Sequence, residues 1–147
     1  MNITCIDPIF GEMTYKHRWF KKQSIMLFKE KWNIIISAMA YNKKPITEAE
    51  RQAYADYMKN EFQNAMTIEE QLKNYINNNL VELTDYWPEA HKIELSSDLA
   101  GIVIPRSLVF EQSGKTIFLL DCVWDEEHGI AVKLTPDIEV GPQFLFL

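Results

Sequence analysis

Cysteine and glycine are scarce in this chain, and their scarcity excludes several kinds of site. Cys5 and Cys122 are the only cysteines and lie far apart, so the sequence contains neither a Cys-x-x-Cys pair nor a disulfide framework. Both are expected to be buried, reduced thiols. The glycines, at positions 11, 101, 114, 129 and 141, occur singly, which excludes a glycine-rich phosphate-binding loop.

Long hydrophobic runs are also missing. No apolar run approaches the roughly 18 to 20 residues that span a bilayer, and the N-terminus lacks the basic-then-apolar layout of a secretory signal. The 147 residues are 47% hydrophobic and 24% charged, which is typical of a soluble globular protein. We therefore expect one cytoplasmic domain, residues 1–147, that has no contact with a membrane.

The net charge of −6 is distributed unevenly along the chain. Residues 1–45 carry a net charge of +5, residues 46–97 a net charge of −6 and residues 98–147 a net charge of −5. If these segments occupy different faces, the molecule has an electrostatic dipole, and a dipolar surface steers charged partners. The charge pattern does not identify those partners.

Residues 1–41 show the alternation that is typical of strands. Between residues 13 and 19, Met, Tyr, His and Trp alternate with Thr, Lys and Arg, and this period of two predicts a half-buried strand. Apolar runs resume on either side of the charged residues 29–31. We interpret the region as an antiparallel meander. Its last strand, around residues 32–40, is apolar on both faces, which predicts a central position in the sheet.

The period changes to a helical one after residue 46. Thr47 and Glu50 form a capping box, in which the hydroxyl accepts from a free backbone N–H and the carboxylate reaches back to the cap. Thr67 and Glu70 repeat this signature twenty residues later, and apolar side chains follow each pair at helical spacing. Two start signals predict a pair of helices and not one long helix.

A second group of strands follows an irregular stretch that ends near residue 101. Strands are expected at 101–105, 107–112, 116–124, 129–135 and, at the end of the chain, 143–147. The order of meander, helical pair and second meander predicts an α+β domain with helices packed on an antiparallel sheet. The apolar C-terminal segment is expected either to complete the sheet or to meet another chain, for example in a homodimer.

The segment "CVWDEEHG", residues 122–129, concentrates reactive side chains between two of these strands. The simplest interpretation is a charged hairpin loop that Gly129 closes. A metal site would recruit His128 together with Asp125, Glu126 or Asp121, but no second strong ligand lies nearby in the sequence. A Cys122–His128 nucleophile pair would need a lowered thiol pKa, and the apolar strand around Cys122 favours a buried, unreactive thiol. We therefore predict no metal, no cofactor and no catalytic residue.

The segment "YKHRWFKK", residues 15–22, interleaves cations with aromatic side chains. Nucleic-acid surfaces often show this pattern, because cations neutralise phosphates while rings stack on bases. The residues of such a surface would be Lys16, Arg18, Trp19, Lys21 and Lys22. The outer face of a hairpin would look similar, with cations in water and aromatics inward. Because the chain is acidic overall, we favour the solvated face and keep a nucleic-acid or regulatory binding module as the alternative.

Three segments together resemble a group of small uncharacterised bacterial proteins. They are "IFGEM…W" near the start, "ITEAERQAYADYM" after the first meander, and "CVWDEEHGIAV", which carries a W-D-x-E-H-G signature. The resemblance spans Phe10–Val132, and its specific part is the motif from Trp124 to Gly129. Members of this group are similar in size and α+β layout to immunity-type proteins that are encoded beside polymorphic toxins.

The resemblance implies a binding function and no catalytic residues. An acidic surface would cover the active or substrate-binding face of a cognate toxin, which is often basic because many such toxins act on nucleic acid, as nucleases do. The residues implied for this contact are Asp125, Glu126 and Glu127, with Trp124 as an anchor and His128 positioning the loop. The basic N-terminal third is a departure that a simple acidic decoy does not require.

Overall fold

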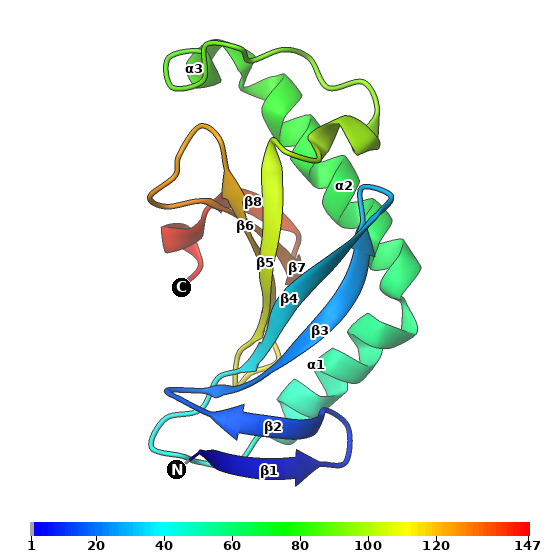
Figure 1. Cartoon of the computed structure of the whole chain (residues 1–147), viewed down its shortest axis with the longest axis vertical. Helices are drawn as coiled ribbons and strands as arrows, with labels where there is room; N and C mark the ends of the chain where they lie inside the picture. The colour runs from blue at the N-terminus through cyan, green and yellow to red at the C-terminus, as the bar shows by residue number, and fades with distance from the viewer. Residues whose placement is uncertain (1) are drawn as a thin grey trace.

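The fold is a single eight-stranded sheet with its helices on one face. A computed structural model describes residues 2–147 (Figure 1). The strands occupy the sheet in sequence order from β1 to β8, so that every strand lies beside its neighbours in the chain. The helices follow one another along one side of the sheet (Figure 1). This arrangement confirms the predicted α+β class.

The strands are β1 (Ile3–Asp7), β2 (Gly11–Tyr15), β3 (Trp19–Leu27), β4 (Glu30–Ala38), β5 (Val103–Phe110), β6 (Thr116–Cys122), β7 (Ile130–Thr135) and β8 (Glu139–Pro142). All neighbouring pairs are antiparallel except β4 and β5, which are parallel. A parallel pair needs a long crossover connection, and the helical segment supplies it. As predicted from its two apolar faces, β4 lies inside the sheet, between β3 and β5.

The helical segment consists of α1 (Glu48–Lys59), α2 (Glu61–Asn78), the short α3 (Leu80–Leu83) and a 3-10 turn at Ser96–Leu99. The capping box of Thr47 and Glu50 is confirmed, since both of its reciprocal hydrogen bonds are present. The second capping box is wrong. The chain bends at Asn60, α2 begins directly afterwards at Glu61, and Thr67 lies inside that helix.

The main core lies between the sheet and the helices. Ile68, Leu72 and Ile76 form the buried stripe of α2, each with 0% of its surface exposed. They belong to one apolar cluster with side chains from the inner face of the sheet, such as Ile36 and Phe118. The predicted packing of helices on the sheet is therefore confirmed.

Four predicted strands differ from the structure. The strand expected across residues 13–19 is a hairpin, in which Tyr15 of β2 pairs with Trp19 of β3 and Lys16–Arg18 form the turn. The strands expected at 101–105 and 107–112 are one strand, β5, with an irregularity in register between Pro105 and Ser107. The expected C-terminal strand is a 3-10 turn, Gln143–Leu145, preceded by the unpredicted β8.

The outer face of the sheet is covered only in part. Phe146 folds back against Ile117 and Ala131, which form a second, smaller apolar cluster.

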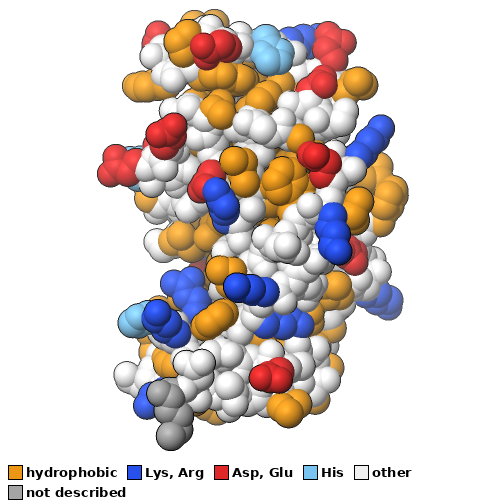
Figure 2. Space-filling view, viewed as in Figure 1, with side chains coloured by type: hydrophobic (Ala, Val, Ile, Leu, Met, Phe, Trp, Pro, Cys, Tyr) orange, Lys and Arg blue, Asp and Glu red, His pale blue; other side chains and the backbone are white. Residues whose placement is uncertain are grey.

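Figure 2 shows the same side of the molecule as Figure 1, with Lys and Arg mostly over its middle and lower parts and Asp and Glu mostly over its upper part. Of the helices formed by residues 2–147, none combines the length and hydrophobicity that crossing a bilayer requires.

Candidate functional site

The loop between β6 and β7 is held in shape by Asp125. Its carboxylate accepts a hydrogen bond from the backbone N–H of His128 at 3.1 Å, and the Nδ1 of the same histidine lies 3.2 Å from both carboxylate oxygens. The Asp125 carbonyl accepts from the N–H of Gly129 at 2.9 Å. Gly129 adopts a φ of +66°, as a tight loop closure requires. The loop is therefore folded by its own hydrogen bonds.

The three consecutive acids of this loop differ in exposure. Glu126, Glu127 and His128 are exposed, whereas the Asp125 side chain retains 31% of its surface. Acidic side chains project at the left edge of Figure 2, where Figure 1 places the β6–β7 loop. We name the exposed group Glu126, Glu127 and His128 the acidic tip. Only two of the three predicted acids are free to meet a partner.

Trp124 packs inward from the base of the loop. Its ring stacks on Tyr75 of α2 with centroids 6.2 Å apart and lies 6.0 Å from the ring of Trp87. The side chain is half-buried and packs against the main core. The predicted partner anchor therefore connects the loop to α2 and to the segment after α3.

An exposed aromatic residue lies beside the acidic tip. Phe144 is 59% exposed, and its ring meets the His128 ring edge to face at 5.2 Å. Gln143 fixes this segment to the sheet, because its amide N–H donates to the Leu120 carbonyl at 2.9 Å. The structure thus places an exposed apolar side chain against His128 of the acidic tip, although Phe144 belongs to the C-terminal turn.

Cys122 lies at the end of β6, below the loop. Burial, the largest effect, together with the negative charges of Asp125 and Asp121, raises the pKa of the thiol to about 12. Its Sγ donates to the Asp125 carbonyl at 3.6 Å. The thiol is therefore protonated at neutral pH and is a poor nucleophile, as expected from its apolar strand.

The side chains considered as metal ligands in this loop do not form a cluster. Residues 2–147 contain no group of three His, Cys, Asp or Glu side chains that could hold an ion. Asp121, one of the ligands considered, pairs with Arg106 at 2.6 Å instead.

The basic segment 15–22 is not a continuous surface. Trp19 is only 6% exposed, and its indole N–H donates to the Lys44 carbonyl at 2.8 Å. Lys21 points toward α1, where its ammonium donates to the Tyr54 hydroxyl at 2.8 Å and lies 4.8 Å from that ring's centroid. Both residues are structural, which corrects their assignment to a nucleic-acid surface.

Lys16 and Lys22 stay exposed, and Arg18 is half-buried. Lys16, His17 and Arg18 line a shallow hollow of about 270 Å³ together with Phe20 and Ile35 on the outer face of the sheet. The cations of the turn therefore lie beside an aromatic ring, but the ring belongs to Phe20 and not to Trp19.

A family model described as a domain of unknown function, DUF6985, matches residues 9–147. The chain belongs to the DUF6985 family. No curated protein and no solved structure matches the chain. The matched residues include the β6–β7 loop, the acidic tip and the C-terminal turn. The family description assigns no activity to this DUF6985 member.

Two site residues of this DUF6985 member carried no signal in the sequence. Phe20 follows the buried Trp19, and an alternating pattern assigns the residue after a core position to the solvent face without indicating a hollow there. Phe144 lies in an apolar C-terminal run that resembles a strand, so its position beside His128 depends on the fold of the last turn.

Proposed function

We propose that this protein acts by binding another protein through the acidic tip and Phe144. The observation that carries the proposal is the exposure of Glu126 and Glu127 on a loop that Asp125 and Trp124 already hold in one conformation. A loop that is ordered before binding loses little conformational entropy in a complex. The proposal assigns no catalytic residue and no cofactor.

The chemistry of this surface suits a cationic partner. Two free carboxylates attract a basic face over a distance and raise the association rate. Phe144 would supply the apolar contact that slows dissociation, because aromatic side chains dominate the energy of many interfaces. A toxin whose active face binds nucleic acid has this basic character. We therefore favour an immunity-type protein of a bacterial toxin system that acts in the cytoplasm.

The test is co-purification with the product of the neighbouring gene, followed by affinity measurements on charge variants. The double variant Glu126→Gln/Glu127→Gln should bind at least about tenfold more weakly, since charge pairs at interfaces commonly contribute this much or more. The matched control Glu89→Gln/Glu94→Gln removes the same charge from exposed positions elsewhere and should bind normally. Equal affinity of the two double variants for the partner would contradict the proposal. The proposal would also be contradicted if both double variants still neutralised the toxin.

The hollow beside Lys16, His17 and Arg18 favours a second candidate function. Lys16, His17 and Arg18 could bind a phosphate, and the ring of Phe20 beside them could stack on a base. A regulatory module that binds nucleic acid would use them. Lys16→Gln/Arg18→Gln should then weaken salt-dependent retention on RNA or heparin, whereas the control Lys31→Gln/Lys59→Gln should not. This candidate is excluded if the parent protein is not retained on RNA or heparin, or if the two double variants are retained equally.

A further inference from the structure

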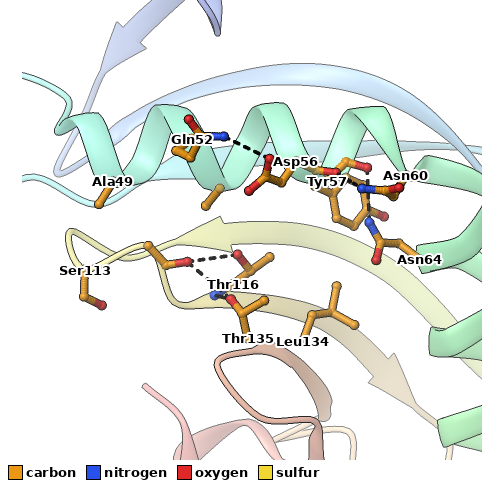
Figure 3. Close-up of a pocket in the computed structure, with 12 residues that line it drawn as sticks. Ala49, Gln52, Asp56, Tyr57, Asn60, Asn64, Ser113, Thr116, Leu134 and Thr135 are labelled. Atoms are coloured by element: carbon orange, nitrogen blue, oxygen red, sulfur yellow. Dashed lines mark hydrogen bonds between the residues drawn. The ribbon is translucent and has the colours of Figure 1, made fainter.

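A groove lined by both polar and apolar side chains lies at the other end of the β6–β7 hairpin from the acidic tip. It has a volume of about 490 Å³ and is formed by α1, the start of α2, the β5–β6 turn and the end of β7. Thr116 and Thr135, which pair across β6 and β7, lie on its floor (Figure 3). Its size falls within the usual range of ligand pockets.

Each amide side chain that lines the groove donates one of its two N–H groups to the protein. The Gln52 amide donates to the Asp56 carboxylate at 2.9 Å, the Asn60 amide to the Asp56 carbonyl at 3.0 Å and the Asn64 amide to the Tyr57 carbonyl at 3.1 Å (Figure 3). Each partner atom is an acceptor, so the orientation of each amide is fixed. Each amide oxygen and the second N–H of each amide are left for a ligand, and all three oxygens are acceptors.

The hydroxyl groups on the opposite wall follow the same pattern. Thr116 and Thr135 both donate to the Gly114 carbonyl, at 3.1 and 3.4 Å (Figure 3). The Ser113 hydroxyl accepts from the backbone N–H of Lys115 at 3.4 Å. Both threonine hydroxyl protons are therefore committed to the protein. On this wall a ligand meets threonine oxygens that can only accept, and a Ser113 hydroxyl that can still donate.

The groove also carries negative charge. Asp56 is the one charged residue among those that line it in the described chain, and its second carboxylate oxygen forms no ion pair there. Lys115, which directly precedes Thr116 in the sequence, forms an ion pair with Glu111 at 3.2 Å. Acceptor oxygens and a carboxylate together favour a ligand that has several donors and a positive charge.

We propose that this groove binds the guanidinium group of an arginine side chain from a partner protein or peptide. A guanidinium presents five donors in one plane and no acceptor, which complements a wall of amide, hydroxyl and carboxylate oxygens. The apolar stem of the arginine would lie against Ala49, Ala53 and Leu134, which also line the groove. The proposal is independent of the acidic tip, because the two sites lie at opposite ends of the hairpin.

The experiment titrates the isotope-labelled full-length protein with Nα-acetyl-arginine methylamide and follows amide chemical shifts. Shifts are expected for the Gln52, Asn60 and Asn64 side chains, with saturation on the order of 1 mM. The matched probe Nα-acetyl-citrulline methylamide has nearly the same shape and no charge and should cause no saturable shift. The lysine derivative should bind several-fold more weakly, since an ammonium has three donors and no plane.

Two variants of opposite effect keep the test independent of folding. Asp56→Asn should weaken arginine binding roughly tenfold, and Ser113→Asp, in the solvated β5–β6 turn, should strengthen it several-fold. The control Asp85→Asn removes an exposed charge far from the groove and should leave binding unchanged. Shifts that are absent from the groove, or equal for arginine and citrulline or for arginine and lysine, would overturn the proposal.

Discussion

The three consecutive acids of the β6–β7 loop have different structural roles. Asp125 accepts the backbone N–H of His128 and is half-buried, whereas Glu126 and Glu127 point into solvent. The sequence presents three acids in a row and contains no signal that separates them. The separation follows from the short Asp side chain, which reaches its own backbone three residues on, and such a contact is seen only when the loop is folded.

Asp125→Ala should lower the free energy of unfolding by about 1 kcal/mol, because it leaves the His128 N–H without its partner. Glu126→Gln/Glu127→Gln should change the same quantity by less than about 0.5 kcal/mol, as exposed substitutions usually do. Urea unfolding of the two variants beside the parent protein measures both effects. If replacing the two glutamates destabilises the protein as much as replacing Asp125, the loop serves the fold alone.

The buried thiol of Cys122 gives a second prediction at the residue scale. With its pKa raised to about 12, the thiolate fraction at about pH 8 is very small, and burial restricts access to reagents. In a Cys5→Ser variant, Cys122 should react with a disulfide reagent only as fast as the protein unfolds. Adding denaturant should restore the rate of a free thiol. Fast reaction of the native variant would show that Cys122 is accessible and ionised.

At the scale of elements, the sequence predicted helices and strands well where a physical signal was local. The capping box at Thr47 and Glu50 marks the true start of α1 because both hydrogen bonds join residues three positions apart. The same letters at Thr67 and Glu70 lie inside α2, where the backbone N–H groups already have helical partners. A capping signature therefore marks a helix start only where the chain before it is not helical.

The false strand at residues 13–19 has a different cause. Tyr15 and Trp19 pair across the β2–β3 hairpin, so both fall on the same face, and their spacing in sequence still matches a period of two. His17 adopts a φ of 69° in this turn without the glycine or asparagine that usually marks a left-handed residue. Because the alternation continues through the turn, composition and period could not reveal it.

The start of α1 also predicts a pH effect. Glu50 is fully buried; its Oε1 accepts from Thr47, and its Oε2 has no hydrogen-bond partner within residues 2–147. Burial raises the pKa of this carboxyl despite the hydrogen bonds from Thr47, so the folded state binds the proton more tightly than the unfolded chain. This contribution to stability is present at a pH below the ordinary glutamate value and is lost as pH rises through the folded pKa.

Glu50→Gln removes the titrating group and keeps the shape of the side chain. The parent protein should therefore lose stability relative to this variant between about pH 4.5 and about pH 7.5. Denaturant unfolding of both proteins at the two pH values gives the difference. Exposed Glu48, on the same turn of α1, supplies the control Glu48→Gln, which should show no such change. A parent protein that gains on the variant as pH rises would contradict the assignment.

At the scale of the whole molecule, the basic first third and the acidic last third of the chain form different halves of the sheet. The basic N-terminal third forms one half of the sheet with its turn at Lys16–Arg18. The acidic last third forms the other half and carries the acidic tip between β6 and β7. The segment charges of the sequence indicate a dipole only if the segments occupy different faces, and they do not show where the segments lie. The sequence could not predict the groove lined by Asp56, because the groove joins α1 to a turn more than fifty residues away, and only the packing of helix on sheet brings them together.

The proposed partner surface of the molecule consists of the acidic tip and Phe144. Backbone hydrogen exchange, measured on the protein alone and in complex with the product of the neighbouring gene, locates that surface most directly. Exchange should slow in the complex for residues 123–129 and for Gln143–Leu145, with no change at the Lys16–Arg18 turn. Protection confined to that turn or to the sheet face beside it, with the acidic tip unchanged, would show that the partner binds elsewhere.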